Sequence, residues 1–269
     1  MIESYFELKG KVGIVTGALG LLGKQHCYAL SEAGATVIVC DLNEKPCKEF
    51  SSELGLNSIG VGVDITDYSS VQNLLKIIKK TFSSIDILVN NAAINEKFED
   101  ASGADELSKF ENYPLELWNR SLNVNLTGMF ICSQVIGGEM ARRKSGSIIN
   151  VASTYGIVAP DQSLYKDENG HQNFYKTAAY PVTKGAVISF TRYLAAYWGN
   201  KEVRVNALSP GGVENFQDQF FIDNYSKRTP LGRMAMPTDY KGALIFLASD
   251  ASRYMTGANL VVDGGYTIW

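Results

Sequence analysis

Three tyrosines lie close to three lysines between residues 162 and 185, and a phenol beside an ammonium group can exchange protons. The pairs are Tyr165 with Lys166, Tyr175 with Lys176, and Tyr180 with Lys184. A free tyrosine titrates near ~10, so proton exchange at neutral pH requires a shift of roughly three units, about 4 kcal/mol. One ammonium group ~4 Å away, at an effective dielectric constant of ~20, supplies about that amount. A tyrosine–lysine pair is therefore a sufficient acid–base device without a metal ion.

Helix geometry favours the third pair. Residues four apart share one face of a helix, whereas immediate neighbours point about 100° apart. Tyr180 and Lys184 begin a strongly helical segment. Pro181 is acceptable there because it lies in the first turn, and Thr177 is expected to cap the helix. We therefore expect Tyr180 and Lys184 to be catalytic.

The other two pairs lie in a polar loop, where we expect them to be solvated and to take no part in catalysis. Their position close to the catalytic pair still makes Tyr165, His171 and Tyr175 candidate substrate contacts. The polar residues of this segment favour a polyol, a sugar or a sugar derivative as the substrate.

Short runs rich in valine and isoleucine alternate with helical segments along the whole chain. We predict strands at 11–17, 35–41, 58–64, 85–91, 146–153, 203–210 and 258–265, and helices at 21–33, 44–54, 67–81, 115–143, 178–199 and 238–248. Strands of this kind are typical of a parallel sheet that is buried on both faces. The pattern predicts one α/β domain over residues 1–269, with a doubly wound parallel sheet flanked by helices. Two long connections, near 95–113 and 154–177, follow strand ends and are expected to shape the ligand site.

The first strand runs into the first helix through the glycine-rich turn TGALGLLGKQ. Gly17, Gly20 and Gly23 allow a tight turn, and they leave the N–H groups at the start of the helix free for a pyrophosphate. Asp41 ends the second strand, where a carboxylate binds both ribose hydroxyls of NAD and repels the 2′-phosphate of NADP. Asp64 ends the third strand, where it either receives the adenine amino group or caps the following helix.

Composition and charge argue against several other classes of partner. The formal net charge is −3 and the sequence pI is about 5.5. Neither a basic stripe nor an apolar run of bilayer length occurs, so we expect neither nucleic acid nor membrane as a partner. The four cysteines share no metal-ligand spacing with the two histidines, so no metal site is predicted. Reduced thiols and an N-terminus without an apolar core segment favour a cytoplasmic protein.

Eight motifs, in order over nearly the whole chain, resemble those of the short-chain dehydrogenase/reductase family. They are TGALGLLG (16–23), DITD (64–67), NNAA (90–93), NVNLTG (123–128), IINVAS (148–153), YPVTK (180–184), SPGGV (209–213) and VVDGG (261–265). The resemblance implies a Rossmann-type sheet of about seven strands in the order 3-2-1-4-5-6-7. Four features depart from the usual pattern of the family. They are the position of Gly20, Ala93 in place of glycine, Asn215 in place of threonine, and the long separation of Ser153 from Tyr180. Because of this long separation, the substrates of ordinary family members do not indicate the substrate of this chain.

The resemblance also implies a catalytic tetrad of Asn125, Ser153, Tyr180 and Lys184. Ser153 would hold the substrate oxygen and Tyr180 would exchange the proton, while Lys184 would bind the ribose and lower the pKa of the tyrosine. Asn125 would hold a water molecule that relays protons to solvent. The cofactor would be NAD, with contacts from Gly17, Gly20, Leu22, Gly23, Asp41, Asp64, Ile65, Asn91, Ala92, Tyr180, Lys184, Gly211 and Val213. Ser153, Tyr165, His171, Tyr175 and Tyr180 would face the substrate.

We therefore expect an NAD-dependent oxidoreductase that moves a hydride between the nicotinamide and a small secondary alcohol or ketone. The sequence looks most similar to family members associated with bacterial sugar and flagellin modification. The apolar helices near 121–140 and 180–199, with the C-terminal YTIW, are expected to join the subunits of a homodimer or homotetramer. Three alternatives are a 3-oxoacyl-thioester reductase, a lyase or epimerase that cycles its bound NAD, and a nucleotide-binding protein without turnover.

Overall fold

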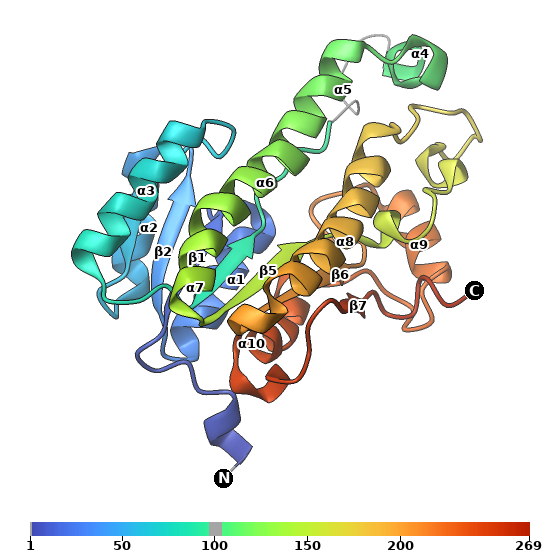
Figure 1. Ribbon diagram of the computed structural model, residues 1–269. Helices are drawn as coiled ribbons and strands as arrows, with labels where there is room; N and C mark the ends of the chain where they lie inside the picture. The colour runs from blue at the N-terminus through green and yellow to red at the C-terminus, as the bar shows by residue number, and fades with distance from the viewer. Residues whose placement is uncertain (1, 97–103) are drawn as a thin grey trace.

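Seven parallel strands form one sheet in the computed structural model, which describes residues 2–96 and 104–269 (Figure 1). The strands are β1 (Val12–Thr16), β2 (Thr36–Asp41), β3 (Ile59–Gly62), β4 (Ile87–Asn90), β5 (Gly146–Val151), β6 (Val203–Pro210) and β7 (Asn259–Val262). Their order is β3-β2-β1-β4-β5-β6-β7, and every neighbouring pair is parallel. The predicted Rossmann-type fold and its strand order are confirmed.

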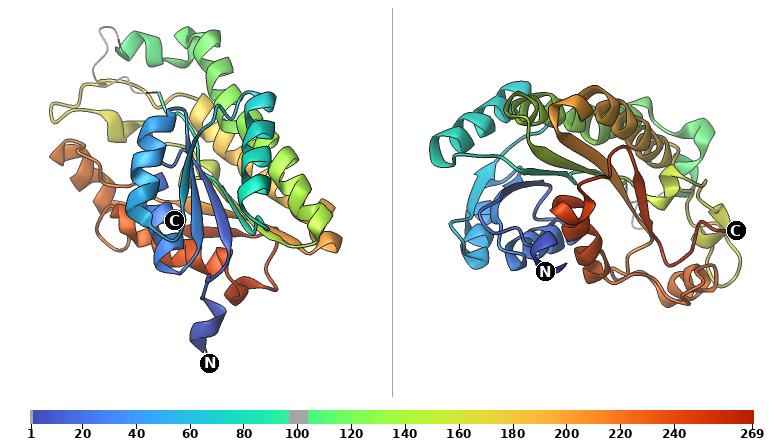
Figure 2. Two further views of the ribbon diagram at one scale, coloured as in Figure 1. Left: turned by 90° about the vertical axis from the view of Figure 1, so that its left-hand side faces the viewer. Right: turned by 60° about the horizontal axis from the view of Figure 1, so that its bottom comes forward.

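Helices cover both faces of this sheet (Figure 2). The α-helices of the described residues are α1 (Leu21–Glu32), α2 (Glu44–Leu54), α3 (Tyr68–Thr81), α4 (Ala104–Ser108), α5 (Leu115–Leu122), α6 (Met129–Cys132), α7 (Gly138–Arg143), α8 (Ala179–Trp198), α9 (Gln219–Lys227) and α10 (Lys241–Ala248). Two π-helical segments, Asn123–Gly128 and Ser133–Gly137, join α5, α6 and α7 into one run. Side chains of α1, α2 and α10 pack in one core cluster, and those of α3, α6, α7 and α8 pack in another. Burial on both faces explains why the strands carry valine and isoleucine at consecutive positions.

Two details of the helices differ from the sequence-based expectations. The cap of α8 is Ala178, and the Thr177 hydroxyl instead donates a 3.3 Å hydrogen bond to Glu96, so the predicted Thr177 cap is wrong. Helix α9 is not among the predicted helices, because its mixed polar and aromatic residues show no long apolar run. Its start is fixed by Asp218, which accepts a 2.8 Å hydrogen bond from the Phe221 N–H.

The connection predicted at 154–177 folds back on itself beside the sheet. It contains two short 3₁₀ turns, Thr154–Gly156 and Gln162–Tyr165, and a bridge between Lys166 and Gln172. The other connection, predicted near 95–113, includes residues 97–103, which lie outside the described residues. Across residues 2–96 and 104–269, no helix is both long enough and apolar enough to cross a membrane.

A buried histidine lies within α1. The His26 side chain is fully buried, and neither ring nitrogen has a hydrogen-bond partner among the described residues. Burial lowers the pKa of His26 to about 4, because the charged imidazolium would lose its hydration without gaining a partner. His26 is therefore neutral in the folded protein at neutral pH.

This histidine is expected to make the protein less stable in mild acid. Its pKa is about 4 when folded and ~6.5 when unfolded, so the unfolded chain binds the extra proton between these values. Stability is then complete above pH ~6.5 and falls as the pH approaches ~4, by about 3 kcal/mol from this group. Urea unfolding of the wild type and of His26→Leu across this range measures the difference. The His171→Leu variant, which alters the exposed histidine, is the control; parallel curves for wild type and His26→Leu would contradict the assignment.

Candidate active site

A cavity of about 480 Å³ lies at the carboxyl ends of β1 to β4, where the order of the strands reverses. Open α/β sheets bind their ligands at this position. Nine residues for which the sequence implies cofactor contact line the cavity: Gly17, Gly20, Leu22, Gly23, Asp41, Asp64, Ile65, Asn91 and Ala92.

Two glycines of the turn at one end of this cavity, Gly17 and Gly23, leave no room for a side chain. Gly17 has a φ of +61°, and a Cβ placed there would lie 2.7 Å from the Cα of Ala92. A Cβ on Gly23 would lie 2.1 Å from the carbonyl oxygen of Gly17. The turn therefore brings bare backbone to the start of α1, as a pyrophosphate requires.

Asp41 stands at the end of β2 on the wall of the same cavity. Its carboxylate accepts hydrogen bonds from the Leu19 N–H at 3.0 Å and the Leu42 N–H at 2.8 Å. These two bonds fix the orientation of the carboxylate and leave lone pairs for ribose hydroxyls. The ammonium group of Lys24 lies over the ring of Phe50 and does not line the cavity.

The structure removes one of the two roles predicted for Asp64, that of a helix cap. Asp64 accepts from the N–H and the hydroxyl of Thr66, at 2.9 and 2.7 Å, and it lines the cavity. Asp67, and not Asp64, caps α3 by accepting from the Ser69 N–H. Arg120 of α5 also lines this cavity, although no sequence motif marks it.

A second cavity, of about 300 Å³, adjoins the first and shares Leu22, Asn91 and Ala93 with it. We call it the catalytic cavity, because three of the predicted catalytic residues, Ser153, Tyr180 and Lys184, line it. The other two residues with an implied cofactor contact, Gly211 and Val213, also lie here. The structure therefore brings the predicted acid–base pair next to the first cavity, which we call the dinucleotide cavity.

Tyr180 and Lys184 lie one turn apart in α8, and Ser153 follows β5. The Lys184 ammonium nitrogen is 5.7 Å from the centre of the Tyr180 ring, and it donates a 2.8 Å hydrogen bond to the Val151 carbonyl. A unit charge ~6 Å away at a dielectric constant of ~20 is worth about 3 kcal/mol to a phenolate. Tyr180 also lies in the first turn of α8, where the helix dipole favours negative charge.

Burial acts against ionisation of both members of the pair. It raises the pKa of Tyr180, and a hydrogen bond with Ser153 works in the opposite direction. It lowers the pKa of the Lys184 ammonium group to about 8. At neutral pH Tyr180 is therefore a neutral phenol, whereas Lys184, with a pKa of about 8, stays mostly protonated.

Asn125 lies in the first π-helical segment, where the extra residue per turn commonly marks a functional site. Its amide nitrogen donates to the Ile94 carbonyl at 3.0 Å and to the Thr183 hydroxyl at 3.2 Å, and its oxygen accepts from the Ile94 N–H. The Asn125 side chain thus joins the chain after β4 to the first turn of α8. The proton relay through Asn125 stays a prediction.

Comparison with known protein families decides the class of this site. A family model described as enoyl-(acyl carrier protein) reductase matches residues 17–267. The chain belongs to the short-chain dehydrogenase/reductase family. It is therefore an NAD- or NADP-dependent oxidoreductase.

Several known members similar to this dehydrogenase carry sugar and polyol names, and one, from Vibrio harveyi, is named a 3-oxoacyl-[acyl-carrier-protein] reductase. It is 34% identical to an NAD-dependent glycerol dehydrogenase from Listeria innocua, over 98% of this chain and 96% of that protein. It is 35% identical to a D-threitol dehydrogenase from Mycolicibacterium smegmatis, over 99% of this chain and 96% of that protein. The crystal structure of a gluconate 5-dehydrogenase from Burkholderia cenocepacia, in complex with NADP and tartrate, superposes with a TM-score of 0.85 at 30% identity over the whole of both chains.

The residues with an implied substrate contact separate in space in this dehydrogenase. Tyr165 lines the catalytic cavity, where it is buried and its hydroxyl lies 3.0 Å from that of Tyr155. The expectation that Tyr165 is solvated is therefore wrong, because Phe174 and Phe221 pack against its ring. His171 does not line this cavity; its side chain is 80% exposed. Tyr175 lines a neighbouring outer cavity and not the catalytic one.

Several residues of the catalytic cavity of the dehydrogenase carry no sequence motif. They are Asn95, Tyr155, Lys176, Gln217, Phe221, Tyr225 and Met234. Tyr225 is fixed by a 2.6 Å hydrogen bond from the Gly212 N–H and stacks on Tyr266 at 4.7 Å. Gln217, rather than Asn215, reaches the cavity and accepts a hydrogen bond from the Asn215 N–H. In the sequence, only the aromatic residues of α9 hint at this part of the cavity wall.

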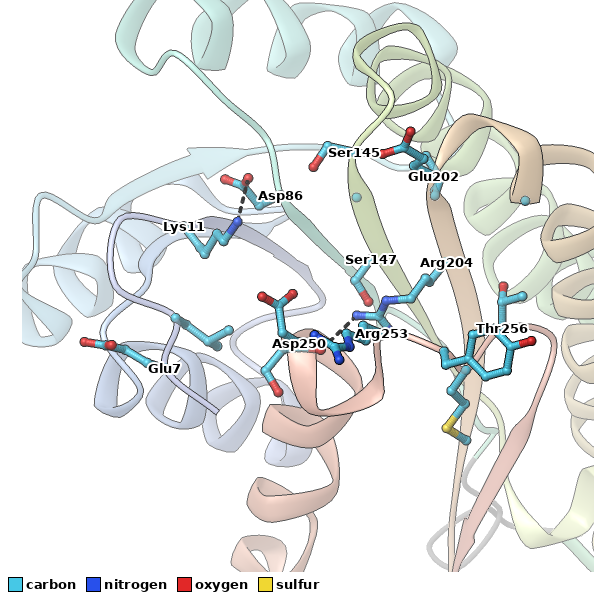
Figure 3. Close-up of a pocket in the computed structure, with 18 residues that line it drawn as sticks. Glu7, Lys11, Asp86, Ser145, Ser147, Glu202, Arg204, Asp250, Arg253 and Thr256 are labelled. Atoms are coloured by element: carbon cyan, nitrogen blue, oxygen red, sulfur yellow. Dashed lines mark hydrogen bonds and ion pairs between the residues drawn. The ribbon is translucent and has the colours of Figure 1, made fainter. Parts of the chain in front are cut away.

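A large cavity at the opposite edge of the sheet is lined by charged and polar side chains, and one ion pair forms within it (Figure 3). Residues at the starts of β1, β5 and β6 line it. Lys11 lies 3.8 Å from Asp86, and Arg204 donates to the carbonyl oxygens of Leu247 and Ser249. These contacts tie strand ends together, so we assign no chemistry to this cavity.

Proposed function

We propose that this protein is an NAD-dependent dehydrogenase that interconverts a secondary alcohol and a ketone on a sugar or polyol. The observation that carries the proposal is the catalytic cavity, where Tyr180, Lys184 and Ser153 adjoin a dinucleotide cavity that ends at Asp41. The names of the relatives, which include glycerol, D-threitol and gluconate, support the substrate class. NAD, when bound, supplies the hydride acceptor and donor for this chemistry.

The chain's own residues would handle the proton and the substrate oxygen. Ser153 donates a hydrogen bond to the substrate oxygen and holds it against the Tyr180 hydroxyl. Tyr180 takes the hydroxyl proton during oxidation and returns it to the oxygen during reduction. The Lys184 ammonium group stabilises the phenolate and binds ribose hydroxyls. Asn125 keeps α8 in register with the chain after β4, and a water-mediated relay of protons past it remains part of the proposal.

The substrate pocket fits a molecule with many hydroxyl groups. Tyr155 and Tyr165 present paired hydroxyls, and Asn95 and Gln217 add amide groups on the same cavity. Burial raises the pKa values of both tyrosines, so their hydroxyls stay protonated and can donate. The aromatic faces of Phe221 and Tyr225 offer an apolar surface to carbon-bound hydrogens.

We further propose a cytoplasmic homodimer or homotetramer joined through the helices near 121–140 and 180–199 and the C-terminus. In the single chain, Phe130 is 48% exposed, and Tyr193 and Tyr197 of α8 are each 63% exposed. The two tyrosine rings stack at 5.9 Å and present a flat apolar face. All four cysteines are free and buried, which suits a reducing compartment. Sedimentation of the purified protein as a monomer would contradict the oligomer.

A screen of polyols, sugars and sugar acids with NAD and with NADP tests the function directly. We expect absorbance of the reduced nicotinamide to appear with at least one polyhydroxy substrate, faster with NAD by about tenfold or more. Turnover only with 3-oxoacyl thioesters would favour the reductase alternative. Conversion of a sugar without released NADH would instead favour a lyase or epimerase.

A further inference from the structure

The dinucleotide cavity has one cationic side chain and no aromatic ring among the described residues that line it. The cation is Arg120 of α5, and the acidic side chains are Asp41 and Asp64. The remaining residues of the wall are small, aliphatic or amide-bearing. The guanidinium of Arg120 is therefore the largest planar group of this wall, and it is the one that an adenine ring could stack upon.

The guanidinium of Arg120 has no partner within residues 2–96 and 104–269. It forms neither a hydrogen bond nor an ion pair there, although Glu116 lies one turn earlier in the same helix. The other arginines of the helical run from α5 to α7 are engaged: Arg142 pairs with Glu139, and Arg143 donates to the carbonyl oxygen of Ser83. The exposed side chain of Arg120 is therefore available to a ligand in the cavity.

The helix that carries Arg120 is fixed beside the cavity. Arg120, Asn123 and Val124 all line the cavity, and their spacing of three and four residues places them on one helix face. Asn125 then holds the helix to the chain after β4, because its side chain exchanges two hydrogen bonds with the backbone of Ile94. The face that carries Arg120 is therefore held toward the cavity by the fold.

The facing wall is the loop after β3. Asp64, Ile65 and Thr66 of this loop line the same cavity, and the Ile65 side chain is buried. The helix packs directly on the loop, since a Cβ on Gly128 would lie only 2.5 Å from the Cδ1 of Ile65. This end of the cavity therefore has aliphatic surface and a carboxylate on the loop, and the Arg120 guanidinium on the helix.

We propose that Arg120 binds the adenine ring of the cofactor by stacking its guanidinium on the face of the ring. Guanidinium groups stack on nucleobases, and their charge is attracted to the π face of an aromatic ring. NAD and NADP share the adenine, so Arg120 would strengthen the binding of both by the same factor, whereas Asp41 would distinguish them. This inference rests on the dinucleotide cofactor of the family and not on the substrate class proposed above.

A cation in this cavity has two other conceivable roles, and each predicts a different result. If Arg120 bound the pyrophosphate, a lysine would replace it, and the binding of adenosine, which has no phosphate, would not depend on it. If Arg120 bound the 2′-phosphate, its loss would weaken NADPH alone. Stacking instead requires a flat group, so an aromatic side chain should replace Arg120 better than a lysine does.

Fluorescence titrations with NADH and NADPH provide the test. Arg120→Leu is expected to weaken both by the same factor of about 3- to 30-fold, which corresponds to ~0.7–2 kcal/mol. Arg120→Tyr should bind both within about threefold of the wild type, whereas Arg120→Lys should remain close to Arg120→Leu. Adenosine, measured by its displacement of NADH, should weaken by the same factor in Arg120→Leu. Reduced nicotinamide mononucleotide, which lacks the adenosine half, should bind the wild type and Arg120→Leu equally.

Arg143→Leu is the matched control, because it removes an exposed arginine of the same helical run that lines neither cavity. Its affinity for NADH should not change. Since Arg120 is exposed and unpaired, its variants should fold, and thermal unfolding without cofactor measures this. An unchanged affinity for NADH in Arg120→Leu, recovery by lysine but not by tyrosine, or a loss confined to NADPH would each overturn the inference. The titrations contain no substrate, so their outcome does not depend on whether a sugar or a polyol is turned over.

Discussion

Replacement of Tyr180 with phenylalanine is expected to lower kcat by about 10²- to 10⁴-fold, the usual contribution of a general acid–base group. The variant keeps the ring beneath Lys176 and loses the hydroxyl that a hydrogen bond joins to Ser153. Because the loss of one hydrogen bond costs only about 1 kcal/mol, the variant should still fold. NADH fluorescence should show binding close to that of the wild type, so that the defect lies in the chemical step.

Tyr193→Phe is the matched control for this result. It removes the same atom from the same helix, α8, at an exposed position that lines neither the dinucleotide nor the catalytic cavity. Its kcat should stay within about twofold of the wild type. Undiminished turnover by Tyr180→Phe would remove the acid–base role from this tyrosine and leave Tyr155, Tyr165 and Tyr225 as the other phenols of the cavity.

The local parts of the site could be predicted because their signals are local. Tyr180 and Lys184 share a helix face by the 3.6-residue repeat, and β5 places Ser153 at the carboxyl edge of the sheet. Asp41 ends a strand whose apolar run is visible in the sequence. The alternation of such runs with helices likewise predicts the sheet, although its strand order rests on resemblance to a family.

The wall that faces the substrate could not be predicted in the same way. The Tyr165 ring is buried because Phe221 of α9 packs against it, and these residues lie far apart in the sequence. The hydrogen bonds between Gln162 and Lys176, and the ion pair between Asp161 and Arg228, likewise form only when the connection folds back. The polar composition of residues 154–177 therefore predicts solvent exposure, whereas in the folded chain the side chains of Tyr165 and Lys176 line the catalytic cavity. His171 follows the composition and stays at the exposed tip.

The dinucleotide cavity supports an equally sharp prediction, which concerns Asp41. Asp41→Asn is expected to lower the NAD-to-NADP ratio of kcat/KM by about 15-fold or more. A carboxylate ~5 Å from a 2′-phosphate of charge about −2 repels it by about 1.7 kcal/mol even at the dielectric constant of water, which corresponds to about 15-fold. Asparagine removes this repulsion and keeps the size of the side chain. It can keep only one of the two hydrogen bonds from Leu19 and Leu42, so NAD itself should bind more weakly.

Two further variants separate the effect of the Asp41 charge from the effect of its hydrogen bonds to the backbone. Glu44→Gln neutralises a nearby carboxylate on α2 that does not line the cavity, so the NAD-to-NADP ratio should not change. Asp41→Ala loses both backbone hydrogen bonds and should weaken both cofactors in addition to losing the discrimination. If the ratio stays constant in Asp41→Asn and Asp41→Ala, the repulsion does not decide the cofactor, and Arg120 becomes the next charged side chain of that cavity to test. Asp41→Asn removes the charge, whereas Asp41→Ala also removes both backbone hydrogen bonds. The NAD-to-NADP ratio therefore measures the contribution of the charge, and the absolute affinity for each cofactor measures that of the hydrogen bonds.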